Sequence, residues 1–304
     1  MVVNPGRRDR LWRGFVIATP YLWLLFFFLI PFAIVLKISF ADPLVAQPPF
    51  SDFFDWSGGA TDRVLATFDN YRFLLEDKLY LVSYLKSIKI ALIATLLCLL
   101  LGFPMAYAIA LTPYPWRNLL LLLVILPFWT SFLLRVYAWM GLLDSSEVGL
   151  INQLLMGLGI VDAPLPLLYN TGAVLTGMIY SYLPFMVLPL YANLVKLDQR
   201  LLEAAGDLGA RPLTTFLSVT LPLSRNGIIA GAMMVFIPAV GEFVIPDLLG
   251  GGGVQMIGRN IWDDFGPNQD WPMAAAVAVV MVLLLIVPIV IFNRSSRREA
   301  EEPA

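Results

Sequence analysis

Residues 203–222, EAAGDLGARPLTTFLSVTLP, stand between two long apolar segments and have the pattern of two short helices joined by a turn. The residues before Gly209 favour a helix with one apolar face, and a glycine in that place ends a helix with a left-handed turn. Pro212 then permits a fresh start, because proline fits the first turn of a helix. Pro222 is expected to end the second helix before the next apolar segment. The sequence therefore predicts a rigid helix–turn–helix within residues 198–222.

The composition of the rest of the chain is that of a membrane protein. Of the 304 residues, 59% are hydrophobic and 14% are charged, whereas a soluble domain has about 25% charged residues. A helix needs about 20 residues to cross the hydrocarbon core of a bilayer. Six such helices are expected, near residues 14–39, 84–111, 118–142, 172–195, 226–249 and 272–292. The predicted fold class is an all-α integral membrane protein with six transmembrane helices.

The residue inventory excludes several kinds of chemistry. The chain has no histidine and one cysteine, Cys98. It therefore cannot form an intrachain disulfide, a zinc site built on histidine and cysteine, or a Ser-His-Asp triad. There is no Walker A sequence, so a partner must bind ATP if ATP drives the protein. No patch rich in Lys or Arg points to nucleic acid. We expect no enzyme activity, no cofactor and no metal.

The distribution of Lys and Arg predicts the orientation in the membrane. Of the Lys and Arg residues, 12 lie in segments 1–13, 112–117, 196–225 and 293–304. Only 4 lie in segments 41–82, 143–171 and 250–271. Because cytoplasmic loops are enriched in Lys and Arg, both termini and the loop within 196–225 are expected in the cytoplasm.

The connecting segments complete the predicted organisation. The insert between the first two spans carries aromatic and acidic residues at positions 50–56. Residues 147–159 have the apolar spacing of a short outer helix. Gly250–Gly253 is expected to form a flexible hairpin. The expected parts of the chain are residues 1–82 with the first span and the insert, a transmembrane core at 83–292, and a cytoplasmic tail at 293–304.

The loop also resembles a known motif. With Val219 in the place of an isoleucine, its residues match the EAA motif of ABC importer permeases, EAA-x3-G-x9-I-x-LP. The resemblance implies a type I (MetI-like) permease fold, in which this loop docks on a separate ATP-hydrolysing subunit. The coupling residues that it implies are Glu203, Ala204, Ala205, Gly209, Leu221 and Pro222. The alternative is an amphipathic loop that only packs against other spans.

Longer stretches resemble the putrescine/spermidine permeases in particular. They are residues 134–141 (LRVYAWMG), 181–186, 237–251 and 256–259. The resemblance implies polyamine import across a bacterial inner membrane, with two ATP-binding subunits, a second and different permease, and a periplasmic polyamine-binding protein. Permeases for iron, thiamine or molybdate share the loop and are the alternative within this family. A secondary transporter driven by an ion gradient is the alternative outside it.

Ionisable residues within the spans are candidates for the substrate path, because burying them in a membrane is costly. Glu242 and Arg135 are expected at similar depths, each about 24 Å from the cytoplasmic end of its span at 1.5 Å per residue. Two interpretations stay open for Glu242, a part of a cation path or an ion-pair partner of Arg135. Since a polycation needs carboxylates and aromatic faces, the other candidates for the path or gate are Asp247, Tyr137, Trp139 and Tyr182. For the aromatic residues, packing or interfacial anchoring is the alternative.

Overall fold

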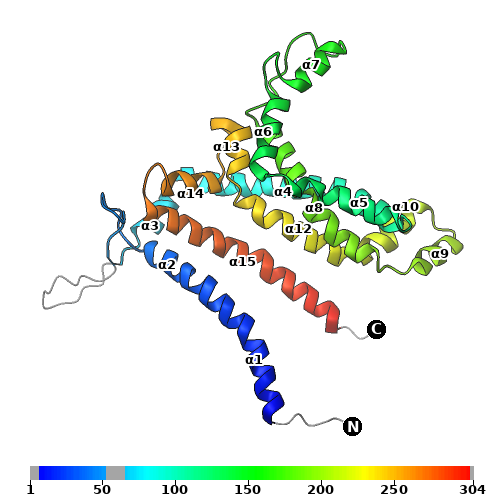
Figure 1. The fold of residues 1–304 in the computed structure, drawn as a ribbon, viewed down its shortest axis with the longest axis horizontal. Coiled ribbons are helices and arrows are strands. Elements are labelled where there is room, and N and C mark those ends of the chain that lie inside the picture. The colour runs from blue at the N-terminus through cyan, green and yellow to red at the C-terminus, as the bar shows by residue number, and fades with distance from the viewer. Residues whose placement is uncertain (1–6, 53–65, 302–304) are drawn as a thin grey trace. The chain divides into compact units, whose positions relative to one another are not determined.

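The protein is all-helical in the computed structural model, which describes residues 7–52 and 66–301 (Figure 1). In chain order the elements are α1 (Arg7–Leu24), the π-helix η1 (Leu25–Leu29), α2 (Ile30–Ile38), α3 (Asp69–Glu76), α4 (Lys78–Leu111), α5 (Trp116–Ile125), the 3-10 helix η2 (Leu126–Trp129), α6 (Phe132–Leu143), α7 (Leu150–Gly157), α8 (Thr171–Leu194), α9 (Gln199–Asp207), α10 (Pro212–Thr215), the π-helix η3 (Phe216–Thr220), α11 (Leu221–Leu223), α12 (Arg225–Val240), α13 (Val244–Gly250), the 3-10 helix η4 (Gly251–Gly253), α14 (Ile257–Phe265) and α15 (Trp271–Glu301). The only pairing of extended residues in this part of the chain is an isolated bridge between Pro43 and Phe50. The predicted all-α class is confirmed.

Four stretches of helix are long and apolar enough to cross a membrane. They are Phe15–Ile38, Lys78–Leu111, Thr171–Leu194 and Trp271–Val290. Two bent pairs of helices, Trp116–Trp129 with Phe132–Leu143 and Pro212–Leu223 with Arg225–Val240, raise the number to six if each pair is one span. The described residues therefore agree with the six predicted spans in number, but two of the spans are not single helices.

The third and fifth spans are broken, so the continuous helices predicted at 118–142 and 226–249 are wrong. In the third, η2 ends before Thr130, and α6 leaves at 90° to the preceding helix. In the fifth, α12 ends at Val240 and α13 begins at Val244. Pro246 explains the second break, because a proline ring collides with the carbonyl four residues earlier in a continuous helix.

The chain divides into two compact units, residues 1–77 with 261–282 and residues 78–260 with 283–304. In the first unit, the buried Asn70 of α3 donates hydrogen bonds to the carbonyls of Ser39 (3.1 Å) and Ala41 (2.8 Å) at the end of the first span. The insert is thereby fastened to the helix that precedes it. Of the aromatic and acidic residues expected at 50–56, those at 53–56 lie outside the described residues.

The second unit is built around α4, α8 and α12, which pack against one another. Gly227 and Gly231 lie on the face of α12 that meets α8. A Cβ atom at Gly231 would lie 3.1 Å from the carbonyl oxygen of Met186. Small residues allow helices to approach closely within a membrane. On α4, Cys98 is fully buried in the same core and packs there as a small apolar residue.

Two short helices lie in the segments between spans. The predicted helix at 147–159 is confirmed by α7. The flexible hairpin expected at Gly250–Gly253 is wrong, because Gly250 ends α13 and Gly251–Gly253 form η4. Helix α14 was not predicted. The side chains of Ser83 and Ser87, one turn apart on α4, hold the start of α14. Asn260 donates its amide to Ser83 Oγ (3.0 Å), and the backbone N–H of Ile257 donates to Ser87 Oγ (2.7 Å).

Replacing Gly231 by Val is expected to lower the free energy of unfolding by about 2 kcal/mol, because the added carbons must force α12 away from α8. Thermal unfolding of the purified protein in detergent measures the effect. Gly141→Val is the matched control, since Gly141 lies in a helix and a Cβ atom there would meet nothing within 4 Å. Equal losses in the two variants would contradict the close-packing role of Gly231.

Candidate functional site

The first half of the 198–222 loop is a capped helix with a left-handed end. The side chain of Asp198 accepts a hydrogen bond from the backbone N–H of Arg200 (3.0 Å) at the start of α9. At its end Gly209 has φ +80°, and the N–H of Ala210 donates to the carbonyl of Ala205 (3.0 Å). This is the glycine-terminated end that the sequence predicts.

The second half is a longer helix than the sequence predicts. Elements α10, η3 and α11 run without interruption from Pro212 to Leu223, so Pro222 lies within the final turn and does not end the helix. The π-turn accommodates this proline, because the N–H of Leu221 bonds to the carbonyl of Phe216 and the missing N–H of Pro222 falls at a change of hydrogen-bond pattern. The helix ends at Ser224, where α12 leaves at 67°.

Phe216 anchors this loop to α4. Its ring packs edge-on against Phe103, with centroids 5.3 Å apart, and against Tyr107, with centroids 6.3 Å apart. The buried Ser224 donates its hydroxyl to the carbonyl of Thr220 (2.6 Å) and so tightens the last turn. The ring contacts join the loop to α4, and the Ser224 bond lies in the last turn before α12.

Large apolar side chains are exposed on both sides of the turn at Gly209. The side chains of Leu208 and Leu213 are 89% and 70% exposed. Glu203 and Gly209, which the motif singles out, are also exposed. Of the remaining motif residues Ala204 and Pro222 are exposed, while Ala205 and Leu221 are partly buried. Large apolar side chains gathered on an exposed surface are typical of a protein–protein contact.

The second group of candidate residues centres on Glu242, which lies in the break of the fifth span. Its Oε1 accepts hydrogen bonds from the backbone N–H groups of Phe243 (3.1 Å), Val244 (3.0 Å) and Ile245 (3.4 Å). The hydroxyl of Tyr182 on α8 donates to Oε2. Glu242 is buried and thus caps the first turn of α13. The structure brings these two predicted residues together.

Arg135 lies apart from Glu242, and no ion pair joins the two in the described part of the chain. The guanidinium carbon lies 5.3 Å from the centre of the Phe128 ring and 5.8 Å from that of Phe132. Its Nε and Nη1 atoms are buried without a hydrogen-bond partner. The prediction of equal depth assumed a straight third span. Arg135 lies on α6, which begins after a 90° bend, so its distance along the span does not give its depth.

Asp247 has an ion-pair partner that its sequence neighbourhood does not predict. Arg259 of α14 forms an ion pair with it (Nη2 to Oδ1, 3.2 Å) and donates from Nη1 to the carbonyl of Gly251 (2.8 Å). As the single cation of segment 250–271, Arg259 could have been singled out. The last two aromatic candidates differ, because Trp139 packs edge-on against a neighbouring ring whereas Tyr137 is 55% exposed.

Both candidate carboxylates have partners within the protein in this structure. The carboxylate of Glu242 is occupied by four donors, and that of Asp247 is paired. The described residues contain no group of three or more side chains suited to hold a metal ion. The candidate coupling loop and α13 lie at opposite ends of the helix bundle, with α12 running between them (Figure 1).

The chain is similar to known transport proteins in sequence. Residues 99–299 match the family model described as binding-protein-dependent transport system inner membrane component. Spermidine/putrescine transport system permease protein PotB of Escherichia coli (strain K12) is 43% identical over 235 residues, which cover 77% of this chain and 84% of that protein. The protein of the same name from Haemophilus influenzae is 39% identical over 281 residues, 92% of this chain and 93% of that protein.

Solved structures with the same fold include a bacterial alginate ABC transporter in complex with an alginate pentasaccharide-bound periplasmic protein, with TM-score 0.66, 20% identity and 98% coverage of both chains. The MetNI methionine ABC transporter, in an inward-facing conformation, matches with TM-score 0.54 and 16% identity over 72% of this chain and 94% of that one. These likenesses concern the fold alone and confirm the predicted ABC importer permease fold.

The bond between Tyr182 and Glu242 is expected to couple the two residues by about 1–2 kcal/mol. Unfolding free energies of Tyr182→Phe, Glu242→Ala and the double variant in detergent give this coupling, since the lost cap of α13 cancels in the cycle. Tyr180→Phe serves as the control, because Tyr180 lies on the same helix but packs on Trp139. A cycle with Tyr182 that is as additive as the one with Tyr180 would rule the bond out.

Proposed function

Because this chain belongs to the family of binding-protein-dependent transport system inner membrane components, we propose that it is the permease subunit of an ATP-driven importer of polyamines. The chain is a multi-pass inner membrane permease and thus part of a transporter, not an enzyme. The observation that carries the polyamine assignment is the 39–43% identity, over most of the chain, to permeases named for spermidine and putrescine.

The proposed assembly contains two ATP-binding subunits, a second and different permease, and a periplasmic polyamine-binding protein. ATP hydrolysis belongs to the ATP-binding subunits, since this chain has no Walker A sequence. The exposed leucines of the 198–222 loop are the proposed contact with one of those subunits. The excess of Lys and Arg in the segments around that loop and at both ends supports a cytoplasmic place for the loop and for both termini.

The loop and the gate are proposed to act through α12. When the ATP-binding subunits close, they push on a loop that Gly209 and Phe216 keep rigid. The displacement passes at the 67° bend into α12, whose far end leads to Glu242. Rotation of α12 separates Glu242 from Tyr182 on α8 and frees the Oε2 atom of the carboxylate. A polycation then finds a negative charge beside an aromatic ring, which is the pair of contacts it needs.

Uptake of radiolabelled putrescine by cells with and without this chain tests the assignment. We expect uptake to depend on the chain and to be suppressed by excess spermidine but not by thiamine or ferric ion. Uptake should persist when a protonophore collapses the membrane potential while cellular ATP is maintained. Competition by ferric ion alone would overturn the polyamine assignment, and loss of uptake with the potential would favour the ion-gradient alternative.

Gly209→Val is expected to reduce uptake at least tenfold while the protein remains in the membrane. A side chain at φ +80° strains the backbone by about 1–2 kcal/mol, and the relief of that strain reshapes the coupling surface. Gly159→Val is the matched control, because Gly159 has φ +67° and lies after α7, outside the loop. We expect its uptake to stay within twofold of wild type. Equal uptake by the two variants would contradict the coupling role.

A further inference from the structure

Two adjoining hollows lie along α4 in the second unit. The first is a groove of about 360 Å³ whose lining is apolar apart from one phenol, and the second is a cavity of about 80 Å³ with a mixed lining. The groove is lined by Leu99, Leu100, Phe103, Pro104, Tyr107, Phe216, Leu221 and Ile228. Tyr107 lines both hollows, so the groove and the cavity adjoin at this side chain.

The hollows follow one face of α4. Leu100, Phe103, Tyr107 and Leu111 are spaced three or four residues apart and therefore share a side of the helix. Eleven residues separate the first from the last, which is about 16 Å at 1.5 Å per residue. The apolar part lies toward the middle of the span and the polar part at its end. This order suits an amphiphilic ligand whose tail enters the membrane.

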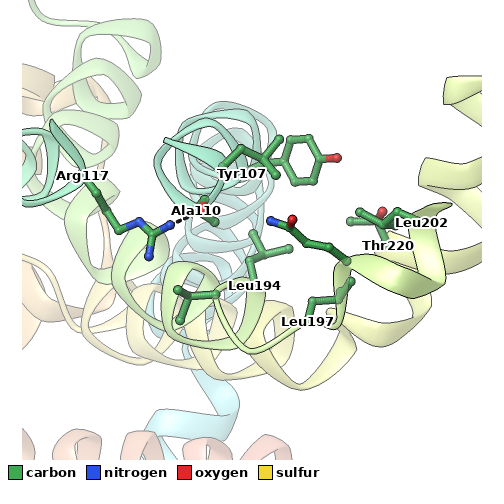
Figure 2. A pocket seen from close by; sticks show the side chains of 10 residues that line it. Tyr107, Ala110, Arg117, Leu194, Leu197, Leu202 and Thr220 are labelled. Atoms are coloured by element: carbon green, nitrogen blue, oxygen red, sulfur yellow. Dashed lines mark hydrogen bonds between the residues drawn. The ribbon is translucent and has the colours of Figure 1, made fainter. Parts of the chain in front are cut away.

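The charge of the cavity favours an anion. Arg117 is the one charged residue among those that line it. Its Nε donates to the carbonyl of Thr112 (3.0 Å) and its Nη2 to that of Ala110 (3.0 Å); Figure 2 shows the second bond beside the cavity. A guanidinium has five N–H groups, so donors remain for a ligand. A polyamine would be repelled here, which separates this site from the proposed transport path.

Thr220 supplies a second, independent observation. Its side chain lines the cavity, is 1% exposed, and has an Oγ1 atom without a hydrogen-bond partner. Figure 2 shows it beside Leu202, across the cavity from Tyr107. A buried hydroxyl without a partner costs about 1–3 kcal/mol. An oxygen atom of a bound ligand would satisfy it.

We propose that an anionic phospholipid binds along α4, with an acyl chain in the groove and its phosphate in the cavity. Basic pockets at the cytoplasmic ends of transmembrane helices bind anionic headgroups. The cytoplasmic placement rests on the proposed orientation of the loop. Because Phe216 and Thr220 of the loop line the hollows, the lipid bridges the loop to α4. Membrane composition thereby adjusts how firmly the coupling loop is held.

Native mass spectrometry of the complete transporter in detergent, titrated with phosphatidylglycerol, tests the headgroup. Phosphatidylcholine with the same acyl chains is expected to bind at least tenfold more weakly. Arg117→Gln should weaken phosphatidylglycerol binding about tenfold, and Arg117→Lys should retain most of it. Lys196→Gln, which removes an exposed cation outside the cavity lining, is the control and should change binding less than twofold.

Leu100→Trp tests the groove, because the larger ring fills it and should also weaken binding about tenfold. Leu96→Trp is its control, since Leu96 is one turn away, 64% exposed and outside the lining. Equal affinity for the two lipids, or equal binding by the Leu100 and Leu96 variants, overturns the proposal. Glycerol phosphate binding as tightly as the lipid would identify a soluble anion instead. The readout is lipid binding, so failure here leaves the uptake result for the proposed function untouched.

Discussion

In a bilayer, every backbone N–H and C=O group must be satisfied by the protein itself, and this constraint governs the fifth span. The helix breaks between α12 and α13, where Pro246 prevents continuation. The carboxylate of Glu242 supplies the acceptors that three freed N–H groups lack. The same break admits α14, because Gly258 approaches so closely that a Cβ atom there would lie 2.3 Å from the carbonyl oxygen of Gly241. One capped break thus organises α8, α13 and α14.

The same constraint bears on the proposed link between the candidate gate and the candidate coupling loop. Helix α12 joins the two and is continuous from Arg225 to Val240, although Pro238 leaves the carbonyl of Met234 without its usual intrahelical donor. In the proposed mechanism this helix carries a displacement from the loop to the break. Its ends are the places where the hydrogen-bond pattern changes, at Ser224 and Glu242. At Glu242 the carboxylate accepts the freed backbone N–H groups, whereas at Ser224 the hydroxyl donates to the carbonyl of Thr220, which also accepts the N–H of Ser224.

Much of this architecture could be predicted from the sequence, and the reasons for the exceptions are physical. The lengths of the apolar segments predicted six membrane crossings. The position of Gly209 after a helix-forming segment predicted the left-handed turn that ends α9. The breaks escaped prediction because an apolar segment has the same composition whether its helix is straight or bent. Depth along a helix says nothing of direction after a bend, so Arg135 and Glu242 do not meet. The pairing of Asp247 with Arg259 depends on α14, whose polar residues resemble those of a surface loop.

The burial of Cys98 has a consequence for measurement. A thiol reacts as an exposed thiolate, and the only cysteine of this chain is fully buried in the core of the second unit. A second cysteine introduced on an exposed surface, such as that of α9, would be the single position open to a fluorescent or spin label. The native sequence therefore needs no background substitution before its motions are followed by spectroscopy.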